Sequence, residues 1–149
     1  MANIPNKIGQ SGLDLIKMFE GLRLEKYQDV VGKWTIGYGY LIMPEERYLD
    51  KITHYEADDL LLKDLNRFEH DISTIVTVDI NQNQFDVLVS LSFNIGTGNV
   101  RKSTLLKYLN QGNYELAANE FSKWNNAGGR EIPGLTYRRK MEKELFLKA

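Results

Sequence analysis

A long stripe of apolar residues in the middle of the chain constrains the fold more than any other feature. Its members recur every three to four residues, which places them on one face of a helix. They are Leu61, Leu65, Phe68, Ile72 and Ile75. Thr53 followed by Glu56 is a capping box, in which each side chain satisfies a first-turn amide. We predict a helix over about residues 54–76, and a helix of that length spans roughly 30 Å, enough to join two lobes.

The pattern before this helix is that of a small sheet. Residues 24–42 are rich in aromatic and β-branched side chains and are interrupted by Gly32, Gly37 and Gly39, which is typical of short antiparallel strands. A helix over Ser11–Glu20 precedes the sheet, and Gly21 is placed to end it.

The rest of the chain is predicted to be mainly helical. One helix starts at Asn81 with Gln84, and others cover Ser103–Leu109, the region of Leu116–Trp124, and Leu135–Leu147. The fold class is therefore α+β. We expect a single domain over residues 1–149, with a front lobe at about 10–55, a connecting helix at about 54–76 and a helical back lobe at about 77–149.

Composition excludes several classes of protein. The chain has no cysteine and only two histidines, so disulfides, thiolate metal sites and histidine clusters are not expected. We predict no metal and no cofactor. The first residues lack the apolar run of a signal peptide, and the longest largely apolar run, residues 85–93, is about half a membrane span. A monomer without stable membrane association is expected.

Charge is unevenly distributed, although the net value is only −1. Residues 1–75 hold 9 Lys and Arg against 13 Asp and Glu, whereas residues 76–149 hold 10 against 7. A basic second half suits an anionic polymer, but ordinary solvated faces give the same pattern. The pI of 6.1 and the lack of a concentrated basic stripe argue against a nucleic-acid partner.

Three polar residues near the predicted sheet are candidates for chemistry: Glu20, Asp29 and Thr35. Glu20 follows Phe19, and a carboxyl beside aromatic surface loses hydration, which favours the protonated form that a general acid needs. Asp29 also fits a structural turn and Thr35 an ordinary strand position. Spacing alone does not bring the carboxylates together, because nine extended residues can span about 30 Å.

These residues stand in a longer ordered pattern. Glutamate, aspartate and threonine are separated by nine and then six residues, within Phe19-Glu20-Gly21, Tyr27-x-Asp29-x-x-Gly32 and Thr35-Ile36-Gly37-Tyr38-Gly39. Further segments are Gln84-Phe85-Asp86, Ser92-Phe93-Asn94-Ile95-Gly96, Ser103-Thr104-Leu105-Leu106, Trp124, Ala127-Gly128-Gly129, Gly134-Leu135, Arg138-Arg139 and Glu142. From about residue 10 onward the chain resembles the phage-type lysozymes, the endolysins of glycoside hydrolase family 24, in their short lambdoid-like form.

The resemblance implies a lysozyme-like fold and hydrolysis of the β-1,4 bond between N-acetylmuramic acid and N-acetylglucosamine in bacterial peptidoglycan. Glu20 would protonate the leaving oxygen, while Asp29 and Thr35 would hold the attacking water. That arrangement implies inversion, with carboxyl groups roughly 6.5–9.5 Å apart. The glycan strand would lie in a groove between the lobes. Its expected contacts are Gly37, Gly39, Asn94, Gly96 and Ser103.

Other features of the resemblance concern charge and location. Tyr40 stands where the family often has histidine, which would usually make a structural ion pair. The replacement is expected to bear on stability before activity, with the tyrosine packing and bonding through its hydroxyl. Arg138 and Arg139 are interpreted either as attracting the anionic peptide stems of the wall or as a solvated helix face. The protein would accumulate in the host cytoplasm and reach periplasmic peptidoglycan once a phage pore opens the membrane.

Two alternatives remain from the sequence. A lytic transglycosylase cuts the same bond with a glutamate and needs no residue to hold water. A catalytically inactive module would only bind glycan or a partner protein. The presence of Asp29 and Thr35 favours hydrolysis over the first, and the complete candidate set argues against the second.

Overall fold

The computed structural model describes residues 1–148, which fall into two compact units. The first, here called the sheet unit, is Ile16–Arg67. The second, the helical unit, is Met1–Leu15 together with the chain from Phe68 onward. The unit boundaries fall within helices α1 (Gln10–Glu20) and α2 (His54–Ile75). The single domain with two lobes stays a prediction.

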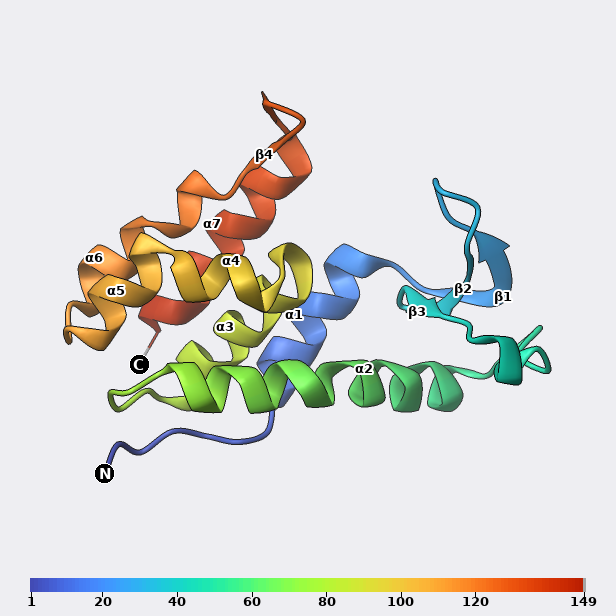
Figure 1. Cartoon of the computed structure of the whole chain (residues 1–149), viewed down its shortest axis with the longest axis horizontal. Helices are drawn as coiled ribbons and strands as arrows, with labels where there is room; N and C mark the ends of the chain where they lie inside the picture. The colour runs from blue at the N-terminus through green and yellow to red at the C-terminus, as the bar shows by residue number, and fades with distance from the viewer. Residues whose placement is uncertain (149) are drawn as a thin grey trace. The chain divides into compact units, whose positions relative to one another are not determined.

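The sheet unit contains the antiparallel sheet expected from the sequence (Figure 1). Its strands are β1 (Arg23–Gln28), β2 (Trp34–Gly37) and β3 (Tyr40–Leu41), in the order β1-β2-β3. The central strand pairs Thr35 with Tyr27 on one side and with Leu41 on the other. The register shifts between Arg23 and Tyr27, which marks a bulge in β1.

Helix α2 begins with the predicted capping box. The Glu56 amide donates to Thr53 Oγ1 at 3.1 Å, and the Thr53 amide donates to Glu56 Oε1 at 2.9 Å. A short 3-10 turn, η1 (Pro44–Glu46), lies between the sheet and this helix. The buried apolar side chains of the sheet unit include Ile16, Ile36, Ile52, Leu61 and Leu65.

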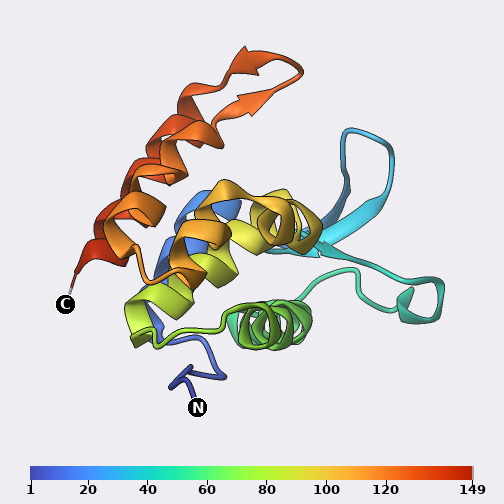
Figure 2. The same ribbon diagram turned by 60° about the vertical axis from the view of Figure 1, so that its left-hand side comes forward.

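The helical unit is built around α3 (Gln82–Ile95), which starts at the predicted Asn81–Gln84 capping box. Its further elements are α4 (Thr97–Lys102), α5 (Thr104–Asn110), α6 (Tyr114–Asn119), η2 (Phe121–Lys123), β4 (Asn126–Ala127), β5 (Arg130–Glu131) and α7 (Pro133–Leu147). Helix α4 and the β4–β5 hairpin, which directly precedes α7 in Figure 2, were not expected from the sequence. Both are too short to show a periodic pattern.

A long-range cap holds the start of α1. The carboxylate of Asp86, on α3, is buried and accepts hydrogen bonds from the amides of Gly9 at 2.9 Å and Gly12 at 3.0 Å, and from Gln82 Nε2 at 2.7 Å. A Cβ on Gly12 would lie 2.5 Å from the Asp86 Cβ, so only glycine permits this approach. The carboxylate of Asp86 on α3 therefore accepts the first amides of α1, which in most helices the side chain of the N-cap residue accepts.

The interpretation of Arg138 and Arg139 as exposed or wall-binding residues was wrong. Their exposed fractions are 4% and 1%, and both face Glu142, which is fully buried. Arg139 Nε lies 2.7 Å and Arg138 Nε 3.5 Å from Glu142 oxygens, and Ser90 Oγ donates to Glu142 at 2.6 Å. Burial raises the pKa of Glu142 and lowers that of Arg139. Arg138 and Arg139 therefore belong to a buried ion cluster between α3 and α7, and their side chains do not face solvent.

Among residues 1–148, no helix combines the length and the apolar character needed to cross a bilayer. Within the same residues, no group of three or more His, Cys, Asp or Glu side chains is placed to hold a metal ion.

Candidate active site

Glu20 is the last residue of α1, and its half-buried carboxylate lies beside the turn between β2 and β3. The helix ends because Gly21 adopts a φ of +74° and donates its amide to the Lys17 carbonyl at 3.1 Å. A Cβ built on Gly39 would lie 3.8 Å from Glu20 Oε1. The candidate acid therefore sits against a backbone segment that carries no side chain.

Asp29 lies in the hairpin that joins β1 to β2, and the turn fixes one of its oxygens. Oδ1 accepts the amide of Val31 at 3.0 Å and the amide of Lys33 at 2.8 Å. The other oxygen, Oδ2, has no hydrogen-bond donor among residues 1–148. The carboxylate is thus oriented by the backbone while one oxygen remains available to accept a proton.

Thr35, 5% exposed, is anchored on the same residue as Asp29. Its Oγ1 donates to the Lys33 carbonyl at 3.0 Å, while the Lys33 amide donates to Asp29. The donated proton leaves the lone pairs of Oγ1 free to accept. The structure therefore brings Asp29 and Thr35 together through Lys33, which the sequence spacing did not establish.

The two candidate glycines of the sheet unit differ in their surroundings. Both have a positive φ, +70° for Gly37 and +88° for Gly39, which explains why glycine is needed. Gly37 is buried, and a Cβ there would contact Ile52 and Ala57 at 3.6–3.7 Å. Gly39 is exposed and faces Glu20. Of the two, Gly39 has the better position to contact a substrate.

The remaining candidate contacts belong to the helical unit. Gly96 ends α3 with a φ of +91° and has open space around its Cβ position. Ser103 is buried, and its hydroxyl caps α5 by accepting from the Leu106 amide and donating to the Val100 carbonyl. Asn94 is half-buried, and its Oδ1 has no hydrogen-bond partner in residues 1–148. Ser103 thus has a structural role, and a substrate contact for any of the three stays a prediction.

Tyr40 forms the hydroxyl bond expected of it. Its Oη donates to Glu46 Oε2 at 2.7 Å and accepts from Lys63 Nζ at 3.1 Å. Burial, together with the bond to Glu46, raises the pKa of Tyr40, and the tyrosine hydroxyl in turn lowers the pKa of Glu46. The roles of Glu46 and Lys63 were not foreseen, because neither residue stands at a helical or strand spacing from Tyr40.

Asp64, on α2, is a second feature that the sequence did not indicate. Partial burial raises the pKa of its carboxyl to about 6, against the opposing attraction of Lys63 and Arg67. A single acidic residue on a helix carries no sequence signal of burial, because its exposure depends on what packs beside it.

Comparison with known proteins now identifies the family. The family model described as phage lysozyme matches residues 17–142. The chain belongs to the phage lysozyme family. The matched segment contains the three catalytic candidates of the sheet unit and all the predicted substrate contacts.

Several phage endolysins are similar to this phage lysozyme family member over most of its length. The endolysin of Bacillus phage B103 is 44% identical over 94% of this chain, but the match covers 54% of that endolysin. The chain thus spans about half the length of the Bacillus phage relatives. The endolysin of Salmonella phage P22 is 40% identical, with 95% of this chain and 98% of the relative covered.

Solved structures confirm the lysozyme-like fold. A variant of P22 lysozyme superposes with a TM-score of 0.88 at 39% identity, covering 95% of this chain and 99% of that one. The muramidase domain of SpmX from Asticaccaulis excentricus gives a TM-score of 0.86 at 37% identity, with 96% and 99% covered. The antiparallel sheet and the mainly helical remainder are therefore those of a phage lysozyme.

Proposed function

We propose that this chain is an endolysin that hydrolyses the β-1,4 bond between N-acetylmuramic acid and N-acetylglucosamine in bacterial peptidoglycan. Family membership supports the reaction class. The observation that carries the proposal is the arrangement in the sheet unit, where Asp29 and Thr35 are fixed on one backbone residue and Glu20 lies beside Gly39. Glycoside hydrolysis needs an acid for the leaving group and a group that activates water.

In this mechanism Glu20 donates its proton to the glycosidic oxygen as the bond to the anomeric carbon breaks. A water molecule donates one hydrogen bond to Asp29 Oδ2 and one to Thr35 Oγ1, which are the two acceptors that the hairpin leaves available. The lone pair of that water then attacks the anomeric carbon, and Asp29 takes its proton. The charge of Asp29 also stabilises the developing oxocarbenium ion. Attack on the face opposite the leaving group inverts the anomeric centre.

The same proposal includes the setting in which the chain works. Its partner is the glycan strand of peptidoglycan, and the protein acts as a monomer without stable membrane association. It accumulates in the host cytoplasm and acts on periplasmic peptidoglycan after a phage pore opens the membrane. Gly37, Gly39, Asn94, Gly96 and Ser103 are the proposed contacts of the strand, and of these Gly37 and Ser103 are buried.

The first test compares the chain with Glu20→Gln on Gram-negative cells whose outer membrane has been permeabilised. Glutamine keeps the size of the side chain but has no proton to give, so clearing should slow by at least ~100-fold. Glu45→Gln is the matched control, because Glu45 is exposed on η1, and it should clear at the parental rate. Equal clearing by the parent and Glu20→Gln would assign the acid to another residue. Failure of the parent to clear would support the inactive binding module.

Product analysis separates hydrolysis from transglycosylation. In water labelled with heavy oxygen, hydrolysis places the label on the anomeric carbon of the new reducing end, whereas a transglycosylase gives an anhydro sugar that is one water lighter. Inversion predicts that the first product formed is the α-anomer, which NMR detects before mutarotation. A β-anomer at early times would contradict the water-holding roles of Asp29 and Thr35.

A further inference from the structure

A pocket of about 370 Å³ lies within the sheet unit, and none of the candidate catalytic residues lines it. Its lining comes from β1, β2 and the segment around η1: Lys26, Trp34, Ile42, Met43, Pro44, Arg47 and Leu49. Trp34 directly precedes Thr35 in β2, and successive side chains of a strand point to opposite faces. The pocket therefore uses the face of the sheet opposite to the one that carries Thr35.

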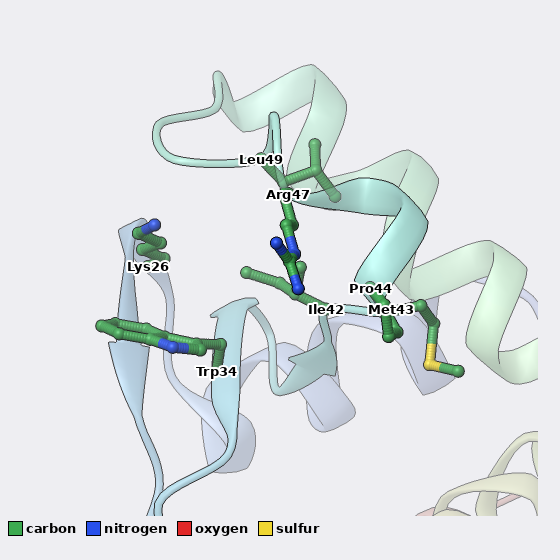
Figure 3. A pocket seen from close by; sticks show the side chains of 7 residues that line it. All are labelled: Lys26, Trp34, Ile42, Met43, Pro44, Arg47 and Leu49. Atoms are coloured by element: carbon green, nitrogen blue, oxygen red, sulfur yellow. The ribbon is translucent and has the colours of Figure 1, made fainter.

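The walls of this pocket are mostly apolar. Trp34 is 46% exposed and Met43 44% exposed, whereas Leu49 is buried. Figure 3 shows the indole of Trp34 on one side and Pro44 with Met43 on the other. An indole and a thioether held partly open to solvent offer an apolar surface to a ligand. A ligand that fills this volume needs an aliphatic body as well as polar groups.

The charge of the pocket comes from Arg47. Lys26 is neutralised by Asp50, with Nζ 2.6 Å from Oδ1, and its ammonium lies 4.8 Å from the centre of the Trp34 ring. Arg47 has no carboxylate partner among residues 1–148, and Figure 3 shows its guanidinium between Trp34 and Pro44, close to Ile42. None of the seven lining residues is acidic. Among the residues that line the pocket, Arg47 is thus the cation without a carboxylate partner in residues 1–148, and the walls beside it are apolar.

We propose that this pocket binds a carboxylate-bearing peptide of two to three residues, as found in the acidic peptide stems of peptidoglycan. A guanidinium presents paired N–H donors that match the two oxygens of a carboxylate. One unpaired cation suits one carboxylate, and the apolar walls suit the methyl and methylene groups of the peptide. The inference rests on the proposed function, because it assigns a second part of the same substrate to a separate surface of the sheet unit.

The probe is a soluble tripeptide of the Ala–γGlu–diaminopimelate type, compared with the same peptide whose carboxylates are converted to carboxamides. The chain has two tryptophans, so its NMR spectrum shows two indole N–H resonances, and Trp34→Phe identifies that of Trp34. The acidic peptide should shift the Trp34 resonance to saturation, whereas the amidated peptide should leave it in place. Equal shifts with both peptides, or no shift with either, would overturn the proposal.

Arg47→Gln tests the cation itself. Loss of a charge-assisted pair within the pocket should weaken binding of the acidic peptide by about tenfold. Arg101→Gln is the matched control, since Arg101 is an exposed arginine of α4 outside the pocket, and its affinity should equal that of the parent. The dispersion of the NMR spectrum reports whether each variant is folded. An unchanged affinity for folded Arg47→Gln would overturn the proposal, because Arg47 is the cation that is proposed to bind the carboxylate.

The failure of this inference can be told from failure of the proposed function by repeating the titration on Glu20→Gln. That variant lacks the candidate acid but keeps the pocket, so it should bind the acidic peptide with parental affinity. If Glu20→Gln loses clearing activity and the peptide binds neither protein, the function stands and the pocket assignment falls. If the peptide binds both proteins while clearing does not depend on Glu20, the pocket stands and the catalytic assignment falls.

Discussion

Asp86→Ala should be among the most destabilising single changes in the helical unit. The side chain is 1% exposed and accepts three hydrogen bonds, two of them from the backbone amides of Gly9 and Gly12 at the start of α1. Alanine would leave these two amides without their acceptor, and an unsatisfied buried donor costs about 1–3 kcal/mol. These two bonds are the cap of α1, and only the Gly12 amide is fully buried, so the free energy of unfolding should fall by about 2–3 kcal/mol.

Urea unfolding followed by circular dichroism measures that change, and amide hydrogen exchange at Gly12 gives a local readout. Exchange at Gly12 should accelerate more in Asp86→Ala than exchange in the middle of α3. Asp59→Ala, an exposed aspartate on α2, is the control and should lie within about 0.5 kcal/mol of the parent. A loss below about 1 kcal/mol, with Gly12 exchange unchanged, would refute the capping role of Asp86.

Two further predictions concern the sheet unit. Tyr40→Phe removes the hydroxyl that joins Glu46 and Lys63, so the free energy of unfolding should fall by about 1 kcal/mol; an unchanged urea midpoint would show that the hydroxyl contributes nothing. Asp64 has a folded-state pKa of about 6, above the ordinary value of 3.8, so its ionisation opposes folding above pH 6 and this penalty disappears as the pH falls towards 4. Asp64→Asn removes this penalty, and because the side chain is only partly buried, the variant should be about 1 kcal/mol more stable than the parent at pH 7. Near pH 4 the two proteins should be equally stable, and thermal melts at the two pH values would measure the difference.

Local signals gave most of the helices and the position of the sheet. The capping boxes at Thr53 and Asn81 lie where they were predicted, because each joins residues three apart in the sequence. The predicted antiparallel sheet is present for a similar reason, since glycines at positive φ mark its turns. Helix α4 and the β4–β5 hairpin were missed because elements of two to six residues show too few turns of any period.

The resemblance to the phage lysozyme family contributed more to the prediction of the candidate site than the physical chemistry of single residues did. Residue types and spacing gave Glu20, Asp29 and Thr35 as an unconnected set, and the ordered motifs of the phage lysozyme family joined them. The structure adds that Asp29 and Thr35 share the backbone of Lys33. No spacing rule could supply that link, because it depends on the register and turn of one hairpin.

The sequence by itself determined most of the helical and extended segments and the caps of α2 and α3, because those choices depend on neighbours a few residues away. Only the tertiary structure decided which polar groups are buried and which are left uncompensated. Arg139 is enclosed with Glu142, and Asp86 accepts the amide of Gly12, 74 residues earlier in the chain. Arg47 lines an apolar pocket and has no carboxylate partner among residues 1–148. The free energy of a charged group depends on its hydration and on the charges around it, and both are set by segments that meet only when the chain has folded.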